Sequence, residues 1–402
     1  MLKSAKKLYS LLVPLDIRHQ IRLGVYNNLR SFGILDYLRR LGLSTCKNYL
    51  PINFNNAEET LKIHNEYVKI HKMIEEDKIK PAEHLEEQKL EGLQGFVATT
   101  ETVLLDIANC GFSFRDNFLF DQQLNAIGET RTEELDRLFP VPVYYKVLST
   151  PTKLKGTVAY LSDSDPGNYY HWMCRTLPLL RIYQKFFDLQ EIDFFYVGQF
   201  SLSSFHKESL TQAGVSISKV RQEACTADRL LVAITSRSIQ YGDPINKAAY
   251  LFSRNLFYNN ASFNMANKKK RIYVKRGNVN RRKLTNETQV IALLEKYRFE
   301  VVEMDNKTVQ EQAEIFYQAE AIVALHGAAL TNLLFIQPGV KVIELIPYGY
   351  VNNCFYVMAN YGEADYFYLQ GEKIRKSQVN VRNIDVFINI HKLERLCEMA
   401  SL

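Results

Sequence analysis

The chain has 402 residues, of which 47% are hydrophobic and 23% are charged, and it carries a net charge of +6. These values are close to the average of folded domains, so they exclude an overall disordered, collagen-like or coiled-coil protein, and the length is typical of two domains. The sequence contains no run of about 18 apolar residues, which excludes a membrane-spanning helix.

The positive charge is concentrated at the N-terminus. Residues 1–50 contain nine Lys and Arg but only two Asp, so they carry +7 and the rest of the chain carries −1. Leu2, Ala5, Leu8 and Leu12 recur at helical spacing among the lysines, which is typical of a basic amphipathic helix at an anionic membrane surface. A packed helical pair with a basic solvated face explains the pattern equally well. We expect no nucleic-acid binding, because basic and aromatic residues are not interleaved and the remaining chain is not basic.

Residues 55–91 are polar and rich in helix-forming side chains, with ten Asp or Glu and six Lys or Arg. This composition predicts a solvated helical connector that Pro81 interrupts, so we assign residues 1–94 to a basic amphipathic arm and a helical connector. Short alternating apolar segments separated by turn residues predict β-hairpins over 95–150.

From residue 157 the pattern changes to alternating strands and helices, which predicts the βαβ units of a parallel sheet. This first series belongs to an N-terminal α/β domain over 95–258. The expected strands are 157–161, 193–198 and 229–234, and the expected helices are 169–187 and 201–213.

The polar residues 259–270 predict a linker, and a second series follows it in a C-terminal α/β domain over 259–402 that includes a terminal helix. Asn286 is the expected N-cap of the first helix in this series. Two such units imply two domains that face each other across a cleft. The expected strands are 271–275, 299–303, 320–325 and 341–346, and the expected helices are 287–297 and 308–318.

The sharpest local motif is the strand that ends in His326-Gly327 and continues into the small residues before Asn332. Free backbone N–H groups in the first turn of a helix suit a phosphate, and ligands of α/β sheets bind at the carboxyl ends of strands. The alternative is a tight packing turn around Gly327.

A basic cluster follows the strand at 271–275 and contains Arg276, Arg281 and Arg282. Arginine forks match phosphate oxygens, so the cluster is a candidate clamp for a diphosphate, although a solvated basic loop has the same composition. Glu344 lies inside an apolar strand, where an unpaired carboxylate is costly. It is expected to accept hydrogen bonds from ribose hydroxyls or to pair with an arginine.

A further motif, Gly167-Asn-Tyr-Tyr-His171-Trp172, opens the first helix of the N-terminal domain. His171 is a candidate general base, but a capping or core histidine is the alternative. Asp163 and Asp165 have the Asp-x-Asp spacing of metal-dependent sugar-nucleotide enzymes. Because Asp-Ser-Asp-Pro-Gly is also ordinary turn chemistry, we expect no metal.

Together these motifs resemble glycosyltransferase family 61, whose members are often labelled capsular polysaccharide biosynthesis proteins. The similar segments are Asn168-Tyr-Tyr-His-Trp-Met-Cys-Arg-Thr-Leu-Pro178, Tyr273-Val-Lys-Arg276, Arg281-Arg-Lys-Leu-Thr-Asn-Glu287, Phe299-Glu-Val-Val302, His326-Gly-Ala-Ala-Leu-Thr-Asn332 and Gly339-Val-Lys-Val-Ile-Glu-Leu345.

The resemblance implies a GT-B-like fold with two Rossmann-like domains, a nucleotide-sugar donor, and inverting hexosyl or pentosyl transfer without a cofactor or an obligatory metal. It places His171 on the acceptor side, where Trp172 and Arg175 are also expected. Because His171 opens a helix opposite the donor motifs, it is the expected catalytic base, with Asp163 and Asp165 of the preceding loop in reserve. The donor-binding residues that it implies are Arg276, Arg281, His326, the backbone of Gly327, Ala328, Ala329, Leu330, Thr331 and Asn332 and, near the ribose, Glu344.

One position departs from the family. Arg175 stands where an acidic residue is common, which weakens His171 as the base or indicates an acidic acceptor. The leading hypothesis is a cytoplasmic enzyme, peripheral on the inner face of the membrane, that extends a polysaccharide or a lipid-linked glycan. The alternatives are a non-catalytic glycan- or nucleotide-binding subunit of a polysaccharide assembly complex and a polysaccharide pyruvyl transferase. The six scattered cysteines favour a reducing compartment.

Overall fold

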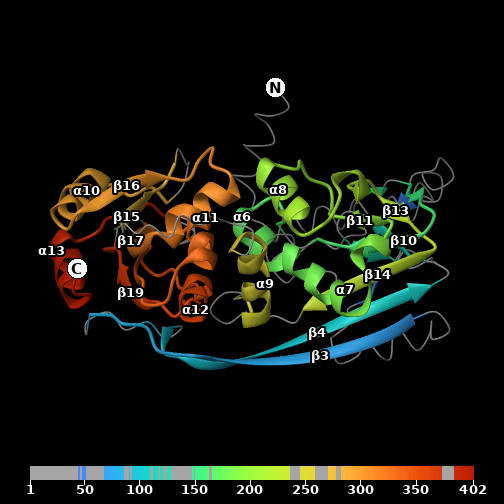
Figure 1. Cartoon of the computed structure of the whole chain (residues 1–402), viewed down its shortest axis with the longest axis horizontal. Coiled ribbons are helices and arrows are strands. Elements are labelled where there is room, and N and C mark those ends of the chain that lie inside the picture. The colour runs from blue at the N-terminus through green and yellow to red at the C-terminus, as the bar shows by residue number, and fades with distance from the viewer. Residues whose placement is uncertain are drawn as a thin grey trace, which may run out of the picture.

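The structure is a computed structural model, and the description below concerns the residues that it describes. These are residues 44–45, 48–50, 68–85, 90, 93–108, 112–115, 118–120, 125–127, 147–148, 150–162, 165–235, 245–258, 270–277, 282–373 and 384–402. The molecule is elongated, with one large sheet at each end and helices between them (Figure 1). The basic arm over residues 1–43 and the linker residues 259–269 lie outside the described residues.

The N-terminal unit is built on a six-stranded sheet in the order β12-β11-β10-β14-β4-β3. Strands β10 to β12 and β14 are parallel, as predicted from the βαβ pattern, whereas β4 runs antiparallel to β14 and to β3. The strand bounds are β3 Val68–Ile79, β4 Phe96–Ala108, β10 Thr157–Tyr160, β11 Phe194–Tyr196, β12 Val220–Arg221 and β14 Arg229–Thr235.

Helices connect these strands. The predicted helix at 169–187 is present as one continuous helical segment of changing pitch. The bounds are α6 Tyr169–His171, a π-helical turn at Trp172–Thr176, a 3-10 turn at Leu177–Leu179, α7 Leu180–Phe186, α8 Ser204–Gln212 and α9 Lys247–Tyr258.

Shorter strands form two further sheets in this half of the chain. The antiparallel pairing of β5 with β6 and of β6 with β7 confirms the hairpins expected over 95–150, although β4 is a long strand. The bounds are β1 Ser44–Thr45, β2 Asn48–Leu50, β5 Ser113–Arg115, β6 Phe118–Phe120, β7 Asn125–Ile127, β8 Val147–Leu148, β9 Thr152–Lys153 and β13 Cys225–Thr226.

The predicted helical connector is wrong for residues 68–79, which form β3. All twelve residues of β3 pair with β4, and this pairing outweighs the helical propensity of the segment. Acidic side chains that suggested a solvated helix are partnered: Glu75 makes a two-pronged ion pair with Arg181, and Asp77 accepts a hydrogen bond from Tyr361 at 2.9 Å. Figure 1 shows the β3–β4 hairpin running along both halves of the molecule.

The C-terminal unit is a five-stranded parallel sheet in the order β16-β15-β17-β18-β19. This is the doubly wound 2-1-3-4-5 order. The second strand is added on one side of the first strand and the later strands on the other, so the strand order reverses between the first and third strands. The four predicted strands are confirmed, and β19 is an additional one. The bounds are β15 Lys270–Lys275, β16 Phe299–Glu303, β17 Ala319–Leu325, β18 Lys341–Ile346 and β19 Asp365–Gln370.

Helices α10 and α13 cover one face of this sheet, whereas α11, the 3-10 helix η10 and α12 cover the other. Asn286 precedes α10 as predicted, but its amide binds the backbone of Ile388 instead of capping the helix. The bounds are α10 Glu287–Lys296, α11 Val309–Tyr317, η10 Ala328–Phe335, α12 Cys354–Tyr361 and α13 Ile390–Met399.

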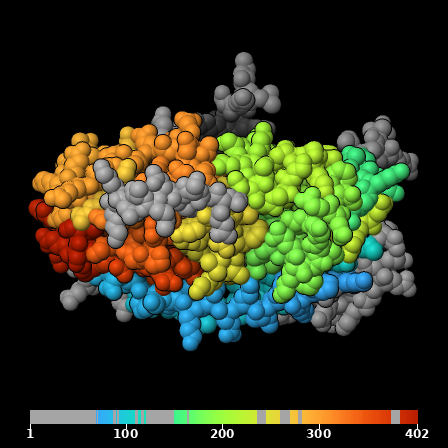
Figure 2. All heavy atoms as spheres, in the orientation of Figure 1, coloured from blue at the N-terminus to red at the C-terminus, as the bar shows by residue number. Residues whose placement is uncertain are grey.

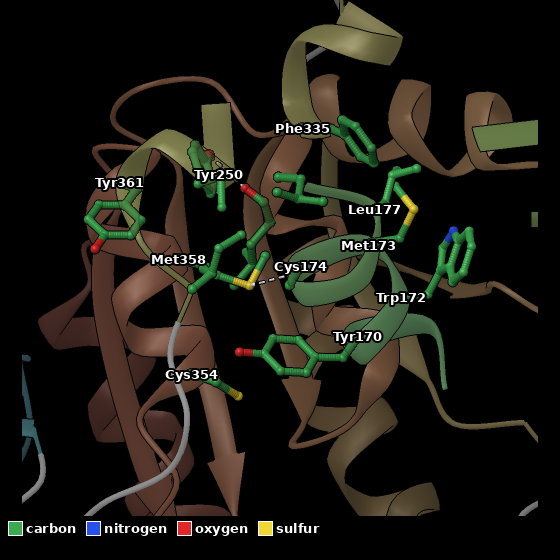
Figure 3. Packing of buried hydrophobic residues seen from close by; sticks show 14 of the residues in the cluster. Tyr170, Trp172, Met173, Cys174, Leu177, Tyr250, Phe335, Cys354, Met358 and Tyr361 are labelled. Atoms are coloured by element: carbon green, nitrogen blue, oxygen red, sulfur yellow. Dashed lines mark hydrogen bonds between the residues drawn. The ribbon is translucent and has the colours of Figure 1, made fainter. Parts of the chain in front are cut away.

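One hydrophobic cluster continues through both units, so they are packed together where they meet. Figure 3 shows Cys174 facing Met358 from the other unit, with the two sulfur atoms 3.8 Å apart. The four described cysteines are buried free thiols, and burial raises the pKa of Cys174, which keeps it protonated and unreactive. Among the described helices, none has the length and apolar character needed to cross a bilayer.

Candidate functional site

The carboxyl ends of β15 and β17 lie side by side at the point where the sheet reverses its order. Arg276 follows β15 and His326 follows β17, so two motifs that are 50 residues apart meet at this edge. The guanidinium Nη1 of Arg276 donates a hydrogen bond to the carbonyl oxygen of His326 at 3.0 Å. In doubly wound sheets this switch point is where ligands bind, so both residues occupy the position expected of a ligand site.

A chain of hydrogen bonds holds the His326 ring. Nδ1 of His326 contacts Oε1 of Glu344, and the Tyr366 hydroxyl donates to Oε2 of the same carboxylate. Glu344 is 0% exposed and His326 is 4% exposed. An ionised carboxylate only accepts, so in that state the contact requires the imidazole proton on Nδ1. Nε2 has no hydrogen-bond partner among the described residues.

This arrangement corrects the expectation for Glu344. Neither a ribose nor an arginine can be its partner here, because both of its oxygens face inward and are occupied by His326 and Tyr366. Burial, followed by the charge of Glu344, raises the pKa of Tyr366 well above its ordinary value, so this hydroxyl remains a donor. Tyr366 could not be identified from the sequence, because it comes from the additional strand β19.

The His-Gly motif leads directly into η10, as expected, but only its first residues are accessible. Ala328 and Ala329 are half-buried, and their N–H groups precede the first intrahelical bond, which runs from Leu330 to Gly327 at 2.9 Å. Gly327 is in extended backbone, and a Cβ atom there would lie 3.2 Å from Nη1 of Arg276. Any side chain at this position would therefore require the arginine to shift by a few tenths of an ångström.

The later residues of the motif are structural. Leu330, Thr331 and Asn332 are each 0% exposed, so their side chains belong to the core. The side chain of Asn332 instead accepts a hydrogen bond from Tyr169 at 2.9 Å and donates one to Gln312 at 2.8 Å. Asn332 thus joins the motif to the first helix of the N-terminal unit.

Arginine side chains surround the exposed start of the motif. Arg276 is half-buried beside Gly327, and the guanidinium of Arg282 lies 5.9 Å from the centre of the Tyr350 ring, which in turn contacts the His326 ring. Arg281 lies outside the described residues. Two guanidinium groups, those of Arg276 and Arg282, therefore lie near this sheet edge.

The first helix of the N-terminal unit docks onto this edge. Tyr169 reaches Asn332, and the rings of Tyr170 and His326 both contact Phe355, with centroids 5.5 and 5.0 Å away. The sequence motif around residue 168 and the His-Gly motif are thereby brought together at the junction between the two units. Tyr169 and Tyr170 belong to the motif that begins at Gly167, but their spacing in the sequence does not predict these contacts.

His171 does not have the environment of an ordinary base. Nη1 of Arg175 lies 3.2 Å from Nδ1 of His171, one helical turn away, so the arginine occupies a ring nitrogen that a base would use. An adjacent guanidinium also opposes the positive charge that an imidazole gains on accepting a proton. His171 is partly accessible, and Asp165 is exposed in the preceding loop. Asp163 lies outside the described residues.

Trp172 is not available to an acceptor. Its side chain is 0% exposed, and its indole N–H donates to Ser209 at 2.7 Å in the core of the N-terminal unit. The expected acceptor-side role of Trp172 is therefore wrong for direct contact, because the helix that begins at Asn168 turns this side chain inward. Asn168 itself caps that helix by accepting a hydrogen bond from the backbone of Tyr170.

A comparison with protein families identifies a segment that contains both of these motifs. Residues 169–343 match the model of the family described as glycosyltransferase 61, which covers somewhat less than half of the chain and includes both motifs of the junction. The resemblance found in the sequence is confirmed for this segment. A search among curated proteins gave no match to the chain.

Proposed function

We propose that the protein, whose residues 169–343 match the glycosyltransferase 61 family model, is an inverting glycosyltransferase that binds a nucleotide-sugar donor at the Arg276–His326 edge. The observation that supports the proposal most is the buried Tyr366–Glu344–His326 chain beside Arg276 at the switch point of the C-terminal sheet. A buried carboxylate and hydroxyl that fix the orientation of one histidine are typical of a preorganised ligand site.

The charge of this edge suits a diphosphate. Arg276 supplies a guanidinium fork, and the N–H groups of Ala328 and Ala329 point out of the start of η10. Charged and backbone N–H donors of this kind stabilise the negative charge that develops on a departing diphosphate. They supply positive charge without a metal, so metal-independent transfer is part of the proposal.

In the proposed reaction an acceptor hydroxyl attacks the anomeric carbon of the sugar. One C–O bond forms, the C–O bond to the diphosphate breaks, and the hydroxyl proton passes to a base. Position favours His171, which lies on the helix that docks onto the donor edge, but its contact with Arg175 favours Asp165 as the acceptor of the proton. The two candidates differ in the pH dependence of turnover, since a carboxylate titrates well below a histidine.

The same Arg175 contact favours a second candidate function. If no other group serves as the base, the domain binds a donor without transferring it, as a non-catalytic subunit of a polysaccharide assembly complex would. A protein that binds nucleotide sugars and turns none of them over with any plausible acceptor would support this second function.

The acceptor class in the proposal is a polysaccharide or a lipid-linked glycan at the cytoplasmic face of a membrane. The basis is the net charge of +7 on residues 1–50, which is attracted to anionic lipid. The hexosyl or pentosyl nature of the transferred group follows from the family resemblance and is part of the same proposal.

The test is a nucleoside-diphosphate release assay over a panel of sugar nucleotides, with and without a chelator. We expect release from one donor, unchanged by the chelator and lost in Arg276→Ala. Activity that disappears in the chelator and returns with manganese would overturn metal-independent transfer. Binding of phosphoenolpyruvate with no binding of nucleotides would replace the proposal with pyruvyl transfer.

A further inference from the structure

Strand β3 forms the outer edge of the N-terminal sheet. In the described part of the chain β3 pairs only with β4 between Val68 and Ile79, so its opposite edge presents backbone N–H and C=O groups over this length. Figure 2 shows the blue atoms of the hairpin at the lower margin of the molecule. A long edge strand of this kind is a template for pairing with another strand.

The exposed face of the hairpin has an apolar centre. Ile74 is 69% exposed in the middle of β3, and Val97 is 60% exposed on β4. Lys72 and Glu76 lie two residues before and after Ile74, and both are exposed on the same face. An isolated apolar side chain needs no explanation, but an apolar residue between opposite charges can pair favourably with the same sequence running antiparallel, because opposite charges then face each other.

The charges of β3 change sign along the strand. The first half carries Lys69, His71 and Lys72, and the second half carries Glu75, Glu76 and Asp77 together with one lysine, Lys78. Parallel alignment of two copies would place like charges opposite each other. Antiparallel alignment places the basic half of one strand against the acidic half of the other, so the strand is complementary to itself in one direction only.

We propose that two copies of this chain associate through antiparallel pairing of their β3 edges about a two-fold axis at Ile74. A two-fold axis perpendicular to a sheet keeps each side chain on its own face. Directly opposite residues must therefore share a face, so the axis lies midway between the two copies of a single residue. With the axis at Ile74, the two Ile74 side chains meet, and Lys72 of each copy faces Glu76 of the other.

Neighbouring registers are less favourable. An axis at Glu75 would place two Glu75 carboxylates together and Lys72 opposite Lys78 of the second copy. An axis at Met73 would place Lys72 against the apolar Ile74. The register at Ile74 also sets His71 opposite Asp77, so it contains opposite charges and no like-charge pair among the exposed residues of the edge.

The first experiment measures the mass of the full-length protein by sedimentation velocity over a concentration series. We expect a dimer in the wild type and at least a tenfold weaker association in Lys72→Glu and in Glu76→Lys, because each change creates two repulsive pairs across the axis. The double variant Lys72→Glu with Glu76→Lys should restore the dimer. A monomeric wild type, or a double variant that remains monomeric, would overturn the proposal.

The second experiment uses cross-linking, which does not depend on the charged pairs. Directly opposite residues of antiparallel strands have Cβ atoms about 4.5–5.5 Å apart, close to the span of a disulfide. Ile74→Cys should therefore form a covalent dimer on mild oxidation. Val97→Cys is the matched control, since it is exposed on the same face and pairs with Lys78, four residues along the strand from Ile74. The two β4 strands would be about 14 Å apart and the two Val97 positions about 27 Å apart along them, so Val97 would lie roughly 30 Å from its copy. Equal cross-linking of both variants, or of neither, would contradict the register.

Discussion

Removal of the Tyr366 hydroxyl tests whether the buried chain behind His326 organises the donor site. In Tyr366→Phe, Oε2 of Glu344 loses its donor while the ring and its packing remain. Glu344 is fully buried, so water does not replace the lost bond. An unsatisfied buried group costs about 1–3 kcal/mol, and more when it is charged.

The same change loosens the orientation of His326, because Glu344 can turn away from Nδ1 to find another partner. Groups that act through a site residue change affinity by roughly 10- to 100-fold when they are removed. We therefore expect Tyr366→Phe to lower the free energy of unfolding in urea by about 1–3 kcal/mol. We also expect it to weaken the binding of UDP, GDP, CDP or ADP, whichever the wild type prefers, in a calorimetric titration.

Tyr368→Phe is the matched control. Tyr368 lies two residues further along β19, is equally buried, and its hydroxyl accepts a hydrogen bond from the backbone of Leu90 at 2.8 Å. This variant should lose stability without losing nucleotide affinity. The reasoning is refuted if both variants lose affinity to the same extent, or if Tyr366→Phe binds nucleotide as tightly as the wild type.

Four further predictions follow from the same structure. Arg276→Ala should lower turnover about 30- to 1000-fold, with partial recovery in Arg276→Lys, because the lost interaction is a charge-assisted donor to the leaving diphosphate; unchanged turnover would make Arg276 a solvated side chain. His171→Ala should lower turnover by roughly 100-fold at unchanged nucleotide affinity if His171 is the base, and a bell-shaped pH profile that persists in this variant would assign the proton to Asp165. Burial raises the pKa of Tyr250 to about 12, so the folded state holds this proton more tightly than the unfolded state; the contribution of Tyr250 to stability should be constant below about pH 10 and fall by about 2–3 kcal/mol by pH 12, so the total fall should be smaller by that amount in Tyr250→Phe. Deletion of residues 1–50 should reduce sedimentation with phosphatidylserine vesicles at low salt, and equal binding by the full-length and shortened proteins would remove the membrane role of the arm.

Regular βα alternation could be predicted because it depends on local apolar periodicity. The strands at 271–275, 299–303, 320–325 and 341–346 form within one or two residues of the expected bounds. Their parallel order placed Arg276 and His326 at the same edge, so the positively charged side of the site could also be predicted from the sequence.

The partners of buried polar groups could not be predicted, because they come from segments distant in sequence. Glu344 was expected to meet a ribose or an arginine, but its partners are His326, which follows β17, and Tyr366, which lies in β19. The polar segment that contains β3 was assigned to a helix, because the pairing with β4 that makes it a strand is a tertiary interaction. The inward direction of Trp172 likewise depends on the packing of its helix against α8.

The central claim is that a nucleoside diphosphate binds where His326 and Arg276 meet, and titration calorimetry of His326→Gln tests it most directly. His391→Gln is the control, since His391 is exposed on α13 and belongs to no described feature of the site. The account predicts that His326→Gln weakens nucleoside-diphosphate binding by at least roughly tenfold while His391→Gln matches the wild type. Wild-type affinity in His326→Gln, in a protein that remains folded, would contradict it.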